Sequence, residues 1–200
     1  MESTRMARLN LWAATGQFVL SVLFIANFSY FMIQHSRKAN QPINMAQCMV
    51  RAGINHPIHV TADTNMDFVI DGGEIFYYLF MMGLSLNFIL AGQALFSCFA
   101  ARQCATCVRA TIIMLNVVLV LFQCVVTYTR YSHVGKVCSG DYLIKPYTLE
   151  TRDLNVLEME GEFLEVYVFA SWIWNVIIVL TLMNHKVGDE ISNDKNERDD

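Results

Sequence analysis

Hydrophobic positions gather in four long uncharged runs separated by polar segments. No Asp, Glu, Lys or Arg interrupts the stretches 9–33, 75–101, 110–129 and 166–185. A transmembrane helix needs about 20 consecutive, mostly apolar residues. The pattern therefore predicts four membrane-spanning helices over these ranges. The first run is longer than the apolar core of a cleavable signal peptide, which favours a retained helix.

Composition agrees with a membrane class. Hydrophobic residues make up 54% of the 200 residues and charged residues only 16%, whereas soluble domains carry about 25% charge. The expected fold is an all-α membrane protein, a four-transmembrane-helix bundle with two longer extracytoplasmic loops. Residues 1–185 form the membrane domain, and 186–200 a polar cytoplasmic tail expected to be disordered. The net charge of −4 argues against a nucleic-acid partner.

Four spans place both termini on the same side as the short loop between the second and third helices. The 14 Lys and Arg residues divide equally between the two sides, so their number alone does not orient the chain. The short loop, however, is flanked by Arg102 and Arg109 and contains no acid, which favours the cytoplasm. We expect a multi-pass protein of the plasma membrane or of endomembranes and vesicles, with cytoplasmic termini.

Each outer loop contains one cysteine, Cys48 in the first and Cys138 in the second. Two cysteines on the same extracytoplasmic side favour a disulfide, because that compartment is oxidising. Such a bridge would tie the two loops into one unit; the alternative is two free thiols. Cys124 lies inside the third run and is expected to be buried as an apolar residue.

Three further cysteines, Cys98, Cys104 and Cys107, cluster at the cytoplasmic ends of the second and third spans. Juxtamembrane cysteines beside arginine are candidates for S-palmitoylation, with inert thiols as the alternative. A zinc site needs four ligands, and here a single CxxC has no nearby histidine. Thiol exchange needs sulfur contact, which about 30 Å of hydrocarbon would prevent between this cluster and the outer pair.

Amide side chains are the polar groups inside the spans. Asn27, Asn87, Asn116 and Asn175 place one asparagine in each predicted helix, and none of the runs has an ionisable residue in its middle. Three further amides in the spans belong to Gln17, Gln93 and Gln123. Amides need partners in hydrocarbon, so these residues are expected at helix contacts, within the bundle or against a partner.

Small residues mark a second helix-packing feature. Gly83, Asn87 and Ala91 recur at four-residue spacing, which permits close helix approach, either inside the bundle or at a dimer face.

The first outer loop has extended character. The β-prone segments 57–61 and 68–70, followed by a turn signal at 71–73, indicate a small hairpin or lid. His56 and His59 fit no established metal-site spacing, and the sequence indicates neither a metal nor a cofactor.

By the layout of its four spans, short inner turn and two outer loops, the chain resembles the MARVEL group of myelin-and-lymphocyte and synaptophysin-like proteins. This resemblance implies roles in membrane apposition, vesicle traffic or accompanying a larger complex, and it assigns no functional residue.

Three hypotheses of function follow. The first is a non-enzymatic membrane organiser, or an accessory or structural subunit whose partners are lipid and either other membrane proteins or copies of itself. The second is an oligomeric pore lined by the asparagines. The third is a membrane thiol-redox enzyme that uses Cys104 and Cys107.

Overall fold

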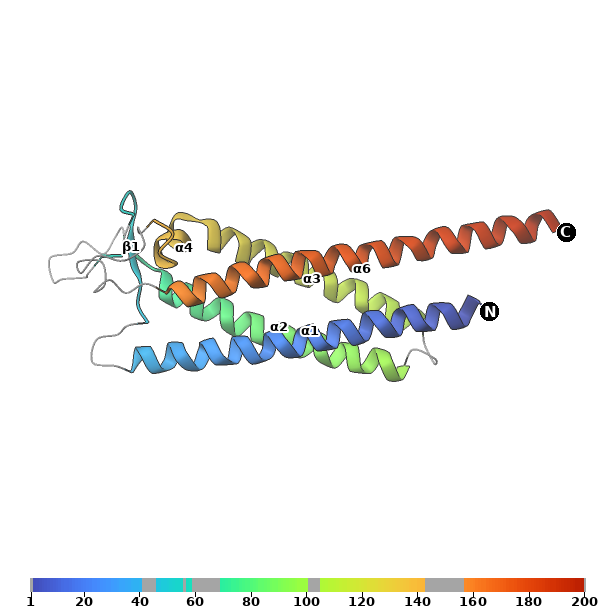
Figure 1. Ribbon diagram of the computed structural model, residues 1–200, viewed down its shortest axis with the longest axis horizontal. Helices are drawn as coiled ribbons and strands as arrows, with labels where there is room; N and C mark the ends of the chain where they lie inside the picture. Colours follow the sequence, from blue (N-terminus) through green and yellow to red (C-terminus); the bar gives the residue numbers. More distant parts are fainter. Residues whose placement is uncertain are drawn as a thin grey trace.

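The computed structural model describes residues 2–40, 46–55, 57–58, 69–100, 105–142 and 157–199, with side chains described between residues 11–97 and 110–180 of these ranges. Four long helices lie side by side in Figure 1, with both chain ends at the same end of the bundle. They are α1 (Glu2–Ala39), α2 (Gly72–Ala100), α3 (Ala105–Tyr131) and α6 (Glu158–Asp199). At the opposite end lie the short helix α4 (His133–Cys138) and the strands β1 (Met49–Arg51) and β2 (Val69–Asp71).

All four long helices contain a segment apolar and long enough to cross a membrane: Leu11–Ala39, Gly72–Ser97, Ala110–Tyr131 and Glu158–Leu180. The expectation of four helices long and apolar enough to span a membrane is therefore confirmed. The chain's 3 prolines lie at positions 42, 57 and 146, between the helices. Since proline removes a helical hydrogen bond, this placement leaves every span uninterrupted.

The helices are longer than the uncharged runs. α6 continues through the polar tail to Asp199, although residues 186–200 are expected from their composition to be disordered. Propagating an existing helix is far easier than nucleating one. In addition, Asp194 and Arg198 have the acid-before-base i, i+4 spacing that favours a helix.

The structure also contains a two-stranded antiparallel sheet, so the predicted all-α class is only partly correct. β1 pairs with β2 in the register Met49↔Asp71, Val50↔Ile70 and Arg51↔Val69. The strand expected at 68–70 is thus present in part, but its partner is β1 rather than 57–61, of which only residues 57 and 58 are described.

Asp71 ends β2 and directly precedes α2, where the sequence suggests a turn. Its Oδ1 accepts the backbone N–H groups of Gly73 at 2.9 Å and Cys48 at 3.2 Å. A carboxylate that accepts N–H groups in the first turn of a helix stabilises that end. α2 therefore begins at Gly72, three residues before the predicted span.

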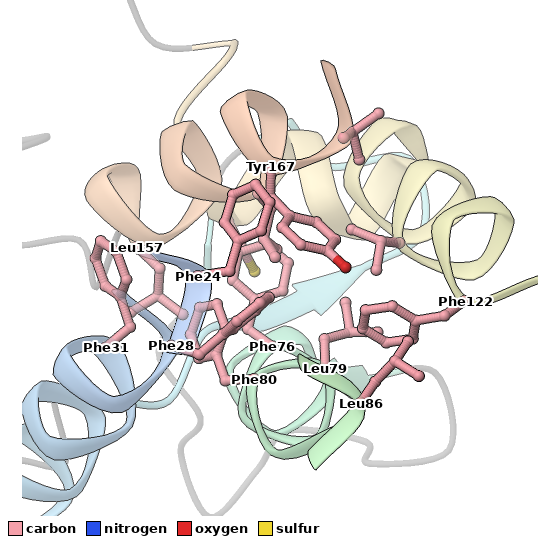
Figure 2. Close-up of a cluster of buried hydrophobic side chains, with 14 of the residues drawn as sticks. Phe24, Phe28, Phe31, Phe76, Leu79, Phe80, Leu86, Phe122, Leu157 and Tyr167 are labelled. Atoms are coloured by element: carbon pink, nitrogen blue, oxygen red, sulfur yellow. The ribbon is translucent and has the colours of Figure 1, made fainter. Parts of the chain in front are cut away.

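A buried cluster rich in aromatic rings, drawn in Figure 2, lies toward the end of the bundle opposite the two chain ends. We call that end the outer end and this half the outer half. The Phe28 side chain is fully buried, and its ring centroid lies 5.0 Å from those of Phe163 and Tyr167. Phe31 stacks against Phe163 at 4.7 Å and Phe80 at 5.7 Å. This cluster joins α1, α2 and α6 through close packing, which is the principal attraction available to helices in lipid.

The most extensive helix contact joins α1 and α2. Gly83, Asn87 and Ala91 are all buried, and an added Cβ at Gly83 would lie 2.4 Å from the Phe28 ring. The small-residue stripe therefore faces α1 inside the bundle, rather than forming a dimer face.

Gly83 should tolerate a methyl group much less well than Gly92 on the same helix. We expect Gly83→Ala to lower the free energy of unfolding by about 1–3 kcal/mol, because overpacking displaces Phe28. Gly92→Ala is the matched control, since nothing lies within 4 Å of its Cβ position. Thermal unfolding in detergent measures both variants, and equal midpoints would contradict this packing.

Candidate functional site

The outer end of the bundle is closed by a disulfide. Cys48 and Cys138 form the predicted bridge, with their Cα atoms 5.8 Å apart and both side chains fully buried. Their carbonyl oxygens accept the N–H groups of Gly72 at 2.8 Å and Leu157 at 2.7 Å. The bridge therefore joins β1 to the end of α4 at the point where α2 and α6 begin.

Glycine is needed beside this bridge. A Cβ added at Gly72 would lie 2.4 Å from the Cys138 Sγ, and one at Gly73 only 1.9 Å from the Ala46 carbonyl oxygen. The Gly-Gly pair, which the sequence suggests as a turn, instead lets the first turn of α2 pass against the disulfide and the chain before β1.

Arg130, at the end of α3, forms the second connection of the outer end. Its side chain is 4% exposed and lies 2.7 Å from Asp141 and 3.1 Å from Glu165. A second Nη contacts the other Asp141 oxygen at 3.1 Å, and Nε donates to the Gly161 carbonyl at 2.9 Å. Bidentate arginine–carboxylate pairs of this kind are among the strongest charged contacts in proteins. We call these residues the Arg130 clamp.

A further ion pair joins α1 to α6. Lys38 Nζ contacts the carboxylate of Glu160, whose side chain is 2% exposed. One turn earlier on α1, the buried His35 ring stacks on Tyr77 of α2, with centroids 5.1 Å apart. Lys38 and Glu160 thus connect α1 to α6, as Arg130 and Glu165 connect α3 to α6.

Deeper in the bundle, two polar pairs cross between helices. Trp174 of α6 donates its indole N–H to the Oε1 of Gln17 on α1. One residue further on, Asn175 donates from Nδ2 to the Oε1 of Gln123 on α3. Adjacent positions of α6 therefore bind two different helices.

A small cavity adjoins these pairs. Gln17, Asn87, Tyr167, Ser171 and Trp174 line it together with four apolar side chains, and about 10 Å³ is open to the centre of a water molecule. That volume is near the minimum for one water. Tyr167 has Asn87 and Ser171 as polar neighbours, but its hydroxyl makes no hydrogen bond of regular geometry with either. The cavity is too small for an organic substrate.

The four predicted amides have different environments. Asn175 makes the interhelical bond described above, whereas Asn87 is buried and donates to the Gly83 carbonyl of its own helix at 2.7 Å. Asn116 is partly buried and donates to the Ile112 carbonyl at 2.8 Å. Asn27 is exposed on the surface of α1.

Gln17 and Gln123 do make the interhelical contacts expected of amides in the spans, whereas the sequence did not indicate Trp174 as a partner. The sequence gives the residue types and their approximate depth in the spans. Which neighbouring helix each side chain faces depends on the rotation of every helix about its axis.

The inner cysteine cluster lies outside the part of the chain whose side chains are described. Cys98 and Cys107 belong to α2 and α3 without described side chains, and Cys104 lies between these helices. Cys124 is a free, exposed thiol on α3, so the expectation that it is buried is wrong; it lies on the outward, apolar face of the span. Among the described residues, no group of three His, Cys, Asp or Glu side chains is placed to hold a metal ion.

Removing the arginine of the clamp should destabilise the bundle. We expect Arg130→Gln to lower the free energy of unfolding by about 1–3 kcal/mol, the cost of lost hydrogen bonds to a charged group. The loss stays moderate because Asp141 and Glu165 are 33% and 52% exposed and can rehydrate. Lys136→Gln, which removes one positive charge from α4, is the control in the same thermal unfolding measurement. A smaller effect at Arg130 than at Lys136 would contradict the clamp.

Breaking the disulfide should have a separate effect. The bridge closes a loop with a sequence separation of 90, so the variant Cys48→Ser/Cys138→Ser should lose about 2–4 kcal/mol of stability. Cys124→Ala is the matched control, because its exposed thiol is free. Peptide mapping without reductant should find Cys48 and Cys138 linked in the native chain; free thiols there would overturn the pairing.

Comparison of the chain with family models, curated proteins and solved structures found no match. The MARVEL-like layout therefore stays a prediction, and the functional argument rests on the residues described above.

Proposed function

We propose that the chain is a non-enzymatic membrane protein that organises the bilayer or serves as an accessory or structural subunit of a larger membrane complex. The supporting observation is how its polar side chains are used. Arg130, Lys38 and Glu160 connect helices at the outer end, and Gln17 and Gln123 connect them at depth. These contacts join α6 to both α1 and α3.

The interior supports this proposal over a pore within one chain. The outer half is filled by the Phe28 cluster, and the polar layer beneath it leaves room for about one water. Conduction through one bundle would require this packing to open. A pore between copies would instead use the outward surfaces, which carry many large apolar side chains.

The disulfide-tied outer end supplies a surface that a partner could recognise. The bridge and the Arg130 clamp bring β1, α4 and the start of α6 together. A surface held in one conformation loses less entropy on binding than a flexible loop. The proposed role therefore uses helix contacts within the membrane and this rigid surface outside it.

Recovery of the tagged full-length chain from native membranes in mild detergent tests the proposal. We expect a membrane protein partner at fixed stoichiometry, or a defined homo-oligomer, and reduced recovery of an outer-end partner by the variant Cys48→Ser/Cys138→Ser. The Cys124→Ala chain is the control and should recover the partner normally. An isolated monomer as the sole product would contradict a structural role, as would single-channel currents from the purified chain in planar bilayers.

A further inference from the structure

One polar side chain on the lipid-facing surface is left unexplained by the bundle. Asn27 is exposed, and its hydrogen bond within the described part of the chain is donated by Nδ2 to the Leu23 carbonyl of its own helix at 2.8 Å. An asparagine amide has two N–H donors and a carbonyl acceptor. One N–H group and the Oδ1 atom of Asn27 therefore face outward without a partner from this bundle.

This amide lies deep in the membrane. Asn27 lies inside the uncharged run 9–33, and ten residues, about 15 Å along the helix axis, separate it from Arg37. The adjacent Phe28 contacts Gly83 of α2, which lies nine residues, about 14 Å along the axis, from Glu74 near the start of that helix. Both helices thus place Asn27 well inside the hydrocarbon, where lipid offers no hydrogen-bond partner.

Two exposed hydroxyl side chains in the spans do not raise the same problem. Ser85 of α2 donates its hydroxyl hydrogen to the Met81 carbonyl at 3.0 Å, and Thr15 of α1 donates to the Leu11 carbonyl at 2.8 Å. A hydroxyl has a single donor, which the helix backbone satisfies. The outward face of α3 presents large apolar side chains suited to lipid, such as Met114, Val118 and Leu121.

We propose that the outward face of α1 pairs with α1 of a second copy of this chain, with the two Asn27 amides hydrogen-bonded to each other at the crossing point. This inference deepens the proposed structural role by naming the partner. The remaining donor and acceptor of one Asn27 complement those of another, so two copies can exchange reciprocal hydrogen bonds. A twofold axis along the membrane normal brings residues of equal depth together, which makes an isologous contact at Asn27 possible.

The spacing along α1 fits such a pair. Leu23, Asn27, Tyr30 and Gln34 follow one another at intervals of four, three and four residues, the repeat of a left-handed helix pair. Leu23 is 56% and Tyr30 48% exposed, so both are available on either side of the amide. Arg37 continues the stripe ten residues beyond Asn27, about 15 Å toward the outer end, where water and headgroups hydrate its charge.

Cross-linking in vesicles tests the pairing directly. The full-length chain carries alanine at positions 98, 104, 107 and 124, retains the Cys48–Cys138 bridge, and is reconstituted at low protein-to-lipid ratio in phosphatidylcholine vesicles. Leu23→Cys places a thiol on the proposed face, and Met82→Cys on α2, 55% exposed and near the centre of its span, is the matched control. Under copper–phenanthroline oxidation we expect a several-fold higher dimer yield from Leu23→Cys. Equal yields would overturn the pairing.

The role of the amide is tested by adding Asn27→Ala to the Leu23→Cys chain. Interhelical hydrogen bonds average about 0.6 kcal/mol each, so losing two of them should lower the dimer association constant by about threefold to tenfold. Ser85→Ala in the same background should leave it unchanged, and Asn27→Gln should restore part of the loss. An intact Cys48–Cys138 bridge and an unchanged unfolding midpoint show that each variant is folded. An association constant insensitive to Asn27→Ala would overturn the proposal.

The two proposals fail in different ways. A chain that is monomeric in vesicles but recovers a different stoichiometric partner from native membranes would overturn the α1 pairing and leave the structural role standing. A chain that pairs through Leu23→Cys and recovers no other protein would support self-assembly through α1.

Discussion

Lipid does not drive helices together by hydrophobic burial, because acyl chains are as apolar as leucine. Every contact in this bundle therefore depends on close fit or on polar pairing. The fit is concentrated around Phe28, which enters the space left by the absent side chain of Gly83 and contacts Tyr167 from the other side. The polar pairs of Gln17 and Gln123 act below this cluster, where fewer rings are available to hold the helices.

Water changes the available interactions at the outer end. Ion pairs with one buried and one hydrated partner become useful there, as between Arg130 and the partly exposed Asp141 and Glu165. The disulfide adds a contact that does not depend on either solvent. The molecule thus uses three kinds of connection in three layers, each suited to the polarity of its layer.

The sequence predicts the parts of this architecture that depend on average polarity. The four spans follow from uninterrupted apolar runs, and the bridge follows from single cysteines placed in two loops on one side. The rotation of each helix about its axis and the pairing of polar side chains are harder to predict from the sequence, because they depend on which helices are neighbours. Asn27 and Asn175 look equivalent in the sequence, yet one faces outward and the other meets Gln123.

The polar tail and the small sheet illustrate two other limits. Composition alone predicts disorder after residue 185. It takes no account of the preceding apolar part of α6, from which the helix can propagate into the tail. The sequence did not predict β1, because Met49–Arg51 is a short strand and its partner β2 lies far along the sequence. The candidate site was only partly predictable for the same reason: Arg130 ends an apolar run, and its partners come from 11 and 35 residues further along the chain.

The bridge between Cys48 and Cys138 also has a consequence for the order of biosynthesis. It encloses β1, β2, α2, α3 and α4 in one covalent ring, while α1 and α6 extend from that ring as two tails. The ring cannot close until α3 has crossed the membrane and delivered Cys138 to the compartment that holds Cys48. A bridged chain is therefore one whose two central helices have both been inserted. The disulfide is thus a covalent marker that this step of membrane insertion is complete.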